Sequence, residues 1–348
     1  MRSKKACLLF VAVFIFALAG CSLGNTGTNS VRSTQETNST VQTKSNGTIT
    51  EGGQANGVWR QITPAAAFPA RMNHQAVVFK DKIWVFGGGN STSELLRDVW
   101  YSSDGLNWVE ATRDGGYPES SGGTSFVFDD RIWFITQQDT GNGYISEIWN
   151  SADGIEWSKV NPSGDFLSRF GKDALVFDDT IWMFGGWNIT FFNDVVCSKD
   201  GVNWTMVSTD ASFSKRADYC SVAFNDKIWL ISGQGGSNTN DVWNSFDGSD
   251  WVQSTSYGKF AKRHCAQSVV FDNKIWIIGG LTDGQSLGND TWYSEDGANW
   301  TELNSPVKFE GRDQFQAVVF KNKIWVIGGR TGDLMGDTEV KNDVWSLE

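Results

Sequence analysis

Five arginines recur at one position of a repeating pattern, each eight residues before the phenylalanine that ends an expected strand. An aspartate stands just before a later strand of the same repeat, and in most repeats a Gly-Gly pair between them offers no side chain to block a guanidinium. Because a buried arginine needs a partner, we interpret these residues as Arg–Asp bridges within each repeat. The expected pairs are Arg71 with Asp98, Arg169 with Asp194, Arg216 with Asp241, Arg263 with Asp290 and Arg312 with Asp343.

The second repeat tests this interpretation. It has Ser120 in place of the arginine, Thr136-Gln137 in place of the glycines and Glu147 in place of the aspartate. Three changes that occur together favour a bridge. The alternative is that the arginines ring one mouth of a central channel and bind anions such as carboxylated sugars or acidic peptides.

A structural role should repeat, so function is expected where the repeats differ on that same face. The candidate ligand-binding residues are aromatic or ionisable side chains that suit stacking on sugar rings or contacts with a protein. The alternative is that single members only plug the channel or cover the ends of the strands. The candidates are His74, Phe170, Trp187, Phe192, Tyr219, His264, Phe315 and Arg330.

Metal and nucleophile motifs are absent from the sequence. The two histidines, His74 and His264, have no ligand-like spacing, so we expect no metal and no cofactor. Three cysteines other than those of the leader, Cys197, Cys220 and Cys265, are expected as buried free thiols, and a disulfide between Cys220 and Cys265 is left open.

These residues sit in a repeat marked by tryptophan. One set of tryptophans, each following an isoleucine, is spaced by 47 or 49 residues. A period of this size, with strand patterns and tight turns, predicts an all-β, six-bladed β-propeller of four-stranded antiparallel blades over residues 57–348. The set is Trp84, Trp133, Trp182, Trp229, Trp276 and Trp325.

The two ends of the repeat region complement each other. The chain stops after Asp343-Val344-Trp345 without a fourth strand, whereas Gly57-Val58-Trp59-Arg60 is a fourth strand without a blade. We therefore expect the N-terminal strand to complete the last blade and close the ring, which removes an open sheet edge.

The segment before the repeats has the features of an export signal followed by a linker. Residues 1–20 have a basic start and an apolar run typical of a signal peptide, and Leu18-Ala19-Gly20-Cys21 resembles the lipobox of bacterial lipoproteins. This resemblance implies export, lipidation of Cys21 and anchoring to the bacterial cell envelope, at the outer membrane or cell surface. Residues 21–56 are rich in Ser, Thr, Asn and Gly, so we expect a disordered linker.

The charge excludes one class of partner. The net charge is −11, and loss of Arg2, Lys4 and Lys5 with the leader would make it −14. A protein this acidic is not expected to bind nucleic acid. We expect a monomer whose partners are the membrane, through Cys21, and a glycan or protein ligand.

The repeat, with its Ile-Trp, Gly-Gly, Asp-Val-Trp and Asp-Gly landmarks, resembles the kelch repeat, and most closely the central-domain type of galactose oxidase. The copper site of galactose oxidase needs two histidines and two tyrosines, and the chain departs from that pattern, so its oxidase chemistry is not carried over. The expectation is a non-catalytic glycan- or protein-binding module. The alternatives are a carbohydrate-active enzyme similar to the sialic acid epimerases, acting on a sugar acid at the channel mouth, and a structural envelope scaffold.

Overall fold

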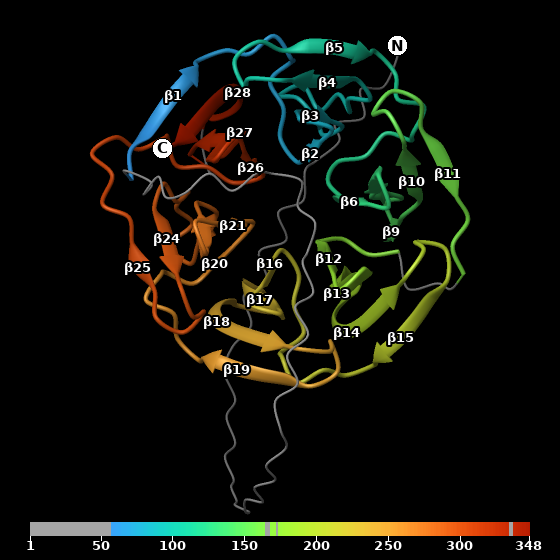
Figure 1. Ribbon diagram of the computed structural model, residues 1–348, viewed down its shortest axis with the longest axis vertical. Helices are drawn as coiled ribbons and strands as arrows, with labels where there is room; N and C mark the ends of the chain where they lie inside the picture. The colour runs from blue at the N-terminus through green and yellow to red at the C-terminus, as the bar shows by residue number, and fades with distance from the viewer. Residues whose placement is uncertain (1–56, 164–167, 172, 334–336) are drawn as a thin grey trace, which may run out of the picture. The chain divides into compact units, whose positions relative to one another are not determined.

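The computed structural model describes residues 57–163, 168–171, 173–333 and 337–348. The expected signal peptide, Cys21 and the linker lie outside the described residues. From residue 57 onwards the chain forms a ring of six blades around a central axis (Figure 1). The described residues contain no helix that is both long and apolar enough to cross a membrane.

The first three blades follow the chain in order, each running from the channel outwards. Blade 1 contains β2 (Gln75–Phe79), β3 (Lys82–Phe86), β4 (Val99–Ser102) and β5 (Val109–Thr112). Blade 2 contains β6 (Thr124–Phe128), β7 (Arg131–Ile135), β10 (Ile148–Ser151) and β11 (Ser158–Val160), with the small hairpin β8 (Gln138–Asp139) and β9 (Tyr144–Ile145) beside it. Blade 3 contains β12 (Asp173–Phe177), β13 (Thr180–Asn188), β14 (Thr190–Ser198) and β15 (Trp204–Ser208).

The other three blades complete the ring. Blade 4 contains β16 (Cys220–Phe224), β17 (Lys227–Gln234), β18 (Asn238–Ser245) and β19 (Trp251–Thr255), and the short strands β20 (Arg263–His264) and β23 (Leu281–Thr282) join it to its neighbour. Blade 5 contains β21 (Gln267–Phe271), β22 (Lys274–Ile278), β24 (Thr291–Ser294) and β25 (Thr301–Glu302). Blade 6 contains β26 (Gln316–Phe320), β27 (Lys323–Gly332), β28 (Thr338–Leu347) and, last, β1 (Trp59–Thr63).

The predicted fold class and the predicted ring closure are confirmed. Strand β1 pairs antiparallel with β28, with Trp59 opposite Leu347. The indole nitrogen of Trp59 also donates to the Thr291 hydroxyl of blade 5, at 3.1 Å, and the side chain is almost completely buried. The strand that closes the ring is therefore held by both of the last two blades.

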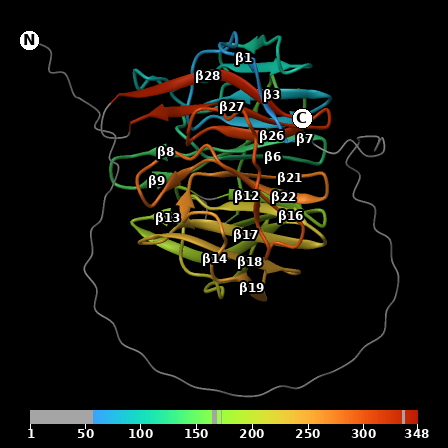
Figure 2. The same ribbon diagram turned by 90° about the vertical axis from the view of Figure 1, so that its left-hand side faces the viewer.

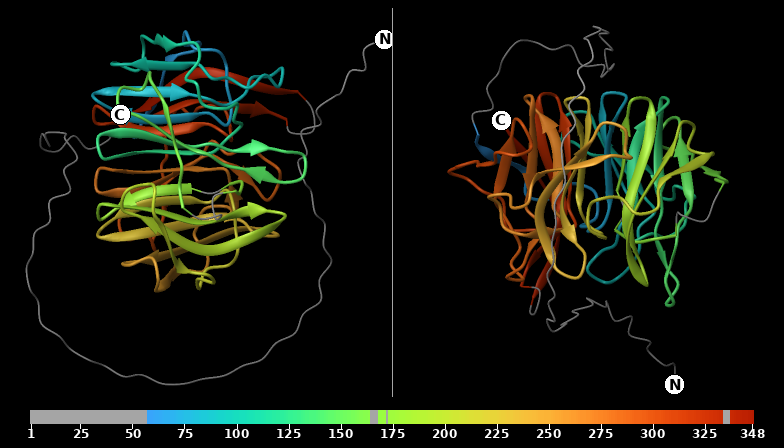
Figure 3. Two further views of the ribbon diagram at one scale, coloured as in Figure 1. Left: turned by 90° about the vertical axis from the view of Figure 1, so that its right-hand side faces the viewer. Right: turned by 90° about the horizontal axis from the view of Figure 1, so that it is seen from below.

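The ring has two distinct faces, seen edge-on in Figures 2 and 3. We call one the turn face, because the tight turns after the innermost strands and before the outermost strands lie there. The other is the mouth face, where the innermost strands begin. Three blades have second and third strands that continue further at this face. In blade 3 Trp187 pairs with Phe191, and in blade 4 Gly233 pairs with Thr239. These strands are β13, β14, β17, β18, β27 and β28.

Apolar side chains between neighbouring blades form the core, and the repeating tryptophan is central to it. The indole nitrogen of Trp133 donates to the Phe128 carbonyl at 3.0 Å, which fixes the ring plane. The turn before the outermost strand of blade 3 contains Gly201 and packs on this indole. A Cβ at Gly201 would come within 2.4 Å of the Trp133 ring. Gly201 has a φ of +72°, so the turn needs glycine both for its backbone and for the close approach of the indole.

All five expected Arg–Asp pairs are present at the mouth face, with nitrogen–oxygen distances of 2.5 to 2.8 Å. Each guanidinium also donates to a backbone carbonyl of the second strand of its blade, as Arg169 does to Gly185 at 2.9 Å. Gly185 has a φ of +43° at a bulge in β13, and this turn of the backbone presents its carbonyl to the guanidinium. The pair thus ties together three strands.

The Gly-Gly pairs have a different role from the expected one of leaving space for the guanidinium. Blade 4 has Ser232 at the first of the two glycine positions, and its carbonyl still accepts from Arg216 at 2.8 Å. The second glycine lies mainly against the innermost strand, and only at Gly186 would a Cβ meet the arginine itself, 2.8 Å from Arg169 Cδ. Close packing of two strands, rather than a path for the arginine, accounts for most of the pattern.

The aspartates have another partner that sequence reasoning missed. In four of the five pairs the tryptophan two residues later donates its indole N–H to the same carboxylate; the donors are Trp100, Trp243, Trp292 and Trp345, at 2.6 to 2.7 Å. Blade 3 has Val196 at this position. In blade 2, which has no such arginine, Glu147 instead pairs with Lys159 at 2.7 Å and accepts from Trp149, while the Ser120 hydroxyl donates to the Gln137 carbonyl.

Removal of either partner of one pair tests its role. Arg216 is fully buried and makes two short contacts with Asp241. We expect Arg216→Met and Asp241→Asn each to lower the free energy of unfolding by about 3–5 kcal/mol, because each leaves a buried charge without its partner. The double variant should lose less than the sum of the two by at least about 1 kcal/mol. Denaturant unfolding of the four proteins measures this.

The control is the pair Arg97–Asp114, which has a 2.8 Å contact but side chains that are 40% and 52% exposed. Its coupling energy should stay below about 1 kcal/mol. Additive effects at Arg216 and Asp241 would contradict the bridging role.

Candidate functional site

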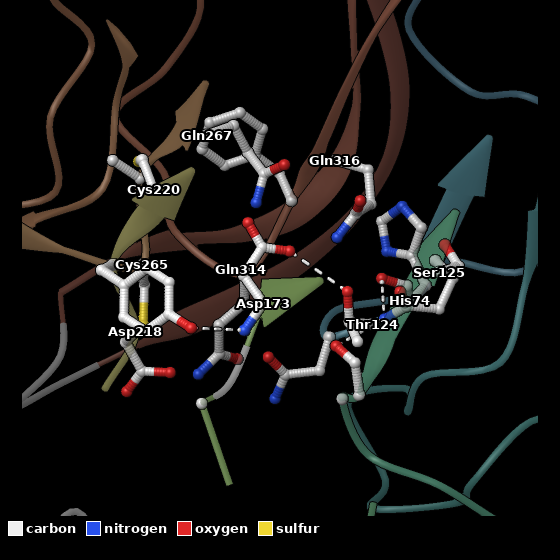
Figure 4. Close-up of a pocket in the computed structure, with 18 of the residues that line it drawn as sticks. His74, Thr124, Ser125, Asp173, Asp218, Cys220, Cys265, Gln267, Gln314 and Gln316 are labelled. Carbon is white, nitrogen blue, oxygen red and sulfur yellow. Dashed lines mark hydrogen bonds between the residues drawn. The ribbon is translucent and has the colours of Figure 1, made fainter. Parts of the chain in front are cut away.

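A cavity of about 260 Å³ lies along the central channel, lined by the first residues of the innermost strands. Its polar lining includes five glutamine side chains, and Figure 4 shows Gln267 and Gln316 directed into it. Among the described lining residues, Asp173 and Asp218 carry carboxylates and no lysine or arginine is present. The five glutamines are Gln75, Gln137, Gln267, Gln314 and Gln316.

Six residues at one register, one from each blade, form a ring at the top of this cavity. All six have positive φ, although only two are glycines. Backbone hydrogen bonds join neighbouring members: Asp218 N–H donates to the Gly171 carbonyl at 2.8 Å, and Cys265 N–H to the Asp218 carbonyl at 2.9 Å. These backbone hydrogen bonds therefore join neighbouring blades where the channel opens. The ring is Asn73, Gly122, Gly171, Asp218, Cys265 and Gln314.

The carboxylate of Asp173 is fully supported by the channel wall. It accepts from the Ser221 hydroxyl at 2.6 Å and from the Thr124 hydroxyl at 3.1 Å, and so links blades 2, 3 and 4. Burial raises the pKa of Asp173, and these hydrogen bonds oppose that increase. Its backbone N–H donates to the Tyr219 hydroxyl at 3.1 Å. Asp173 is thus part of the wall.

Asp218 is in a different situation. Its carboxylate lies beside the bare Cα of Gly171, where a Cβ would be 2.6 Å from Oδ1. It forms no ion pair with any described residue. Burial, and then the nearby charge of Asp313, raise its pKa to about 7. A carboxyl group that is partly desolvated in a channel and unpaired is a feature typical of functional sites.

Above the ring, the residue that follows each arginine position lies beside the residue that follows each glycine pair. In blade 3 these are Phe170 and Trp187, which exchange backbone hydrogen bonds of 2.7 and 2.8 Å. Tyr144, from β9 of blade 2, packs on both, with ring centroids 5.3 Å from Phe170 and 5.8 Å from Trp187. Burial, and to a smaller extent the charges of Asp139 and Asp218, raise the pKa of Tyr144. We call these three rings the aromatic cluster.

The opposite side of the mouth is charged. The corresponding residues of blade 6, across the ring from blade 3 in Figure 1, are Asp313 and Arg330. Their side chains form a two-point ion pair, with distances of 2.6 and 2.9 Å. This is a correction: Arg330 was expected to be available to a ligand, but its guanidinium is already paired. The mouth therefore has one aromatic side and one side that carries a neutralised charge pair.

The other predicted ligand-binding residues do not all reach the mouth. His74, Tyr219 and Phe315 are buried in the wall, where the Tyr219 hydroxyl donates to the Phe184 carbonyl. Burial, together with the charge of Arg71, lowers the His74 pKa to about 3, so its ring is neutral. All three line the cavity as buried parts of its wall, and their role in ligand contact stays a prediction.

Two more candidates lie at the mouth face with partners of their own. Phe192 covers the Arg169 guanidinium, whose carbon lies 4.4 Å from the ring centroid. His264 Nδ1 is hydrogen-bonded to Asn238 Oδ1 at 2.9 Å, and its pKa is lowered chiefly by burial. Of the sequence-derived set, Phe170 and Trp187 are the pair that the structure brings together beside the cavity.

Cys197, Cys220 and Cys265 are free thiols, so the disulfide left open between Cys220 and Cys265 is not formed. Burial raises the pKa of Cys220 to about 12, which keeps that thiol protonated. No three His, Cys, Asp or Glu side chains in the described ranges are grouped so that they could hold a metal ion.

The blades, the closing strand and the cavity along the axis together define a six-bladed β-propeller with a central channel. The family model described as "KLHDC2/KLHL20/DRC7 Kelch-repeats domain" matches residues 54–236, more than half of the chain. The protein therefore belongs to the kelch-repeat family. A second model, "DUF6242 beta propeller domain", matches residues 234–346.

Comparison with solved structures supports the fold. The structure titled "Structure of YjhT" is similar with a TM-score of 0.64 and 14% sequence identity, over 81% of this chain and 96% of that one. At this identity the similarity concerns the fold alone. A search of curated protein sequences finds no match.

The raised pKa of Asp218 leads to a prediction about stability and pH. Between pH 4 and 7 the unfolded chain loses this proton while the folded protein keeps it, so ionisation of Asp218 costs stability as the pH rises through this window. We expect Asp218→Asn to raise the melting temperature at pH 7.5 by about 2–4 °C, which corresponds to about 1 kcal/mol. The gain should shrink towards pH 4.

Thermal unfolding followed by circular dichroism from pH 4 to 8 makes this measurement. Asp226→Asn, at an exposed carboxyl on the turn face, is the control and should leave the pH dependence unchanged. A lower melting temperature for Asp218→Asn at pH 7.5 would show that the carboxylate has a stabilising partner.

Proposed function

We propose that this protein is an exported, lipid-anchored and non-catalytic carbohydrate-binding protein, whose propeller binds a sugar residue of a glycan at the mouth of its channel. The single observation that supports this most is the aromatic cluster placed at the edge of a polar cavity. Aromatic faces stack on the apolar faces of sugar rings, and amides and carboxylates bond the hydroxyls at their rim.

The dimensions and the polarity of the cavity favour a sugar. Its volume of about 260 Å³ is just below the range usual for drug-sized ligands, so it suits one sugar ring at the end of a chain. The amides of Gln137, Gln267 and Gln316 line it from three different blades. Each amide can both donate and accept, as sugar hydroxyls do.

The state of the arginines favours this function over an enzyme that acts on a sugar acid. Such an enzyme would need a cation available to the substrate carboxylate. Every described arginine at the mouth already contacts an aspartate, including Arg169 and Arg330. If the protein were only a structural scaffold, the difference between the aromatic side of the mouth in blade 3 and the ion pair in blade 6 would have no role.

The anchoring part of the proposal rests on the sequence of the leader. The apolar run that ends in Leu18-Ala19-Gly20-Cys21 fits export followed by lipidation of Cys21. A linker of about 35 residues with the composition of a flexible coil would reach on the order of 30–35 Å, enough to hold the propeller clear of a membrane surface.

Glycan binding can be tested on an array of neutral and charged glycans, probed with the full chain in mild detergent. We expect specific binding that Trp187→Ala and Tyr144→Ala each weaken at least about tenfold, because stacking on an aromatic face is lost. Phe246→Ala is the matched control, since this ring is 66% exposed and lies on the turn face. An array on which no glycan is retained would refute the proposal, as would equal losses in all three variants.

Anchoring can be tested separately with Cys21→Ser. We expect the wild-type protein to fractionate with membranes and to carry a lipid-modified N-terminal Cys21 in mass spectrometry. The variant should keep its leader or appear in the soluble fraction, because the lipid attachment atom is gone. A wild-type N-terminus at another residue, without lipid, would contradict the assignment.

A further inference from the structure

Asp218 and Phe170, a member of the aromatic cluster, line the same cavity. The Asp218 carboxylate lies on Gly171, the residue directly after Phe170. Tyr144 packs on Phe170 and Trp187 pairs with it, so the aromatic cluster and this carboxylate lie at the same part of the channel mouth. Burial, the charge of Asp139 and then the charge of Asp218 raise the pKa of Tyr144. These groups come from three different blades.

The described cations near Asp218 are already committed. Arg330 pairs with Asp313, and Arg169 pairs with Asp194. Burial lowers the pKa of His264, which disfavours its charged form, and its ring is hydrogen-bonded to Asn238. Among the described residues, the other titratable groups coupled to the charge of Asp218 are Tyr144, Asp313 and Cys265, none of which supplies a positive charge. A carboxylate removed from water without a cation is costly, and a ligand can supply the missing charge.

Aromatic faces add a second requirement to that of the carboxylate. An ammonium group within about 6 Å of a Trp, Tyr or Phe ring is attracted by the electrons of the ring, and this attraction grows when water is excluded. Aromatic side chains together with a carboxylate form the arrangement that recognises organic ammonium ions. A neutral sugar could stack on the same rings, but its hydroxyls would leave the charge of Asp218 uncompensated.

We infer that the channel mouth selects an amino sugar, with the ammonium group held by the carboxylate of Asp218 and by the faces of Tyr144, Phe170 and Trp187. This inference rests on the proposed carbohydrate-binding function and specifies its ligand. N-acetylation of the sugar removes the positive charge and adds bulk, so it should abolish the preference. A sugar acid should be repelled by Asp218.

The test compares the trimers of glucosamine and of N-acetylglucosamine, which differ in having ammonium or neutral acetamide groups, with maltotriose as a neutral reference. Titration calorimetry at pH 7.0, close to the pKa of Asp218 and of the glucosamine amino groups so that both charged forms are present, uses the full chain in mild detergent. We expect the glucosamine trimer to bind at least about tenfold more tightly than either neutral trimer. In Asp218→Asn this preference should fall to about twofold or less, while Asp226→Asn, which makes the same change on the turn face, should retain it.

The outcomes separate the two claims. Equal affinity for the three trimers, no binding of the glucosamine trimer, or an unchanged preference in Asp218→Asn would each overturn the ammonium inference. Carbohydrate binding itself would still stand if the array retains neutral glycans and Trp187→Ala abolishes that retention. A folding defect in Asp218→Asn is recognised by its melting temperature, and Trp187→Ala then provides the second variant, which should weaken binding of the glucosamine trimer at least about tenfold.

Discussion

A guanidinium buried over a backbone carbonyl organises the mouth of this propeller. Arg169 shows the arrangement: it donates to the carbonyl of Gly185 in the second strand and to Asp194 at the start of the regular part of the third strand. Its position sets the register of three strands relative to one another. One consequence is that the next residue, Phe170, must lie beside Trp187. In blade 6 the same constraint brings Asp313 beside Arg330. The same backbone geometry thus holds, in each blade, a pair of residues whose types vary between blades. These pairs make the sides of the mouth chemically different.

The repeating parts of this arrangement are readable from the sequence because each has a local cause. The turns before the outermost strands need glycine, and Gly201 shows why: the Trp133 indole occupies the space that a side chain would need. Closure of the ring also follows from the sequence, since a fourth strand is missing at one end and present at the other. The Arg–Asp pairs are predictable because the second repeat loses all parts of the pair together, with Ser120 in place of the arginine.

The candidate site at the mouth is less predictable, for reasons that are also physical. Tyr144 lies in a connection of blade 2 that has no counterpart at the same spacing elsewhere, so no register places it over Phe170. Asp218 does occupy a repeated position, but its lack of a partner depends on Asp313 and Arg330 having already satisfied each other. The extended hairpin of β13 and β14 was hidden because the bulge at Gly185 interrupts the strand pattern before it resumes. These features depend on contacts between residues that are far apart in the chain, and a single sequence does not reveal such contacts.

The closing strand also sets the direction in which the ring can bear a mechanical load. The described chain enters at Gly57 on the turn face, where Trp59 lies opposite Leu347 near the other end of the chain, while the mouth opens on the other face. Tension between an anchor that precedes Gly57 and a ligand held at the mouth would therefore run along the axis of β1. Antiparallel hydrogen bonds lie across the strands, so such a pull shears the β1–β28 ladder as a whole and does not peel its bonds one at a time. The β1–β28 seam is therefore oriented to resist a pull of this direction with its whole ladder of hydrogen bonds.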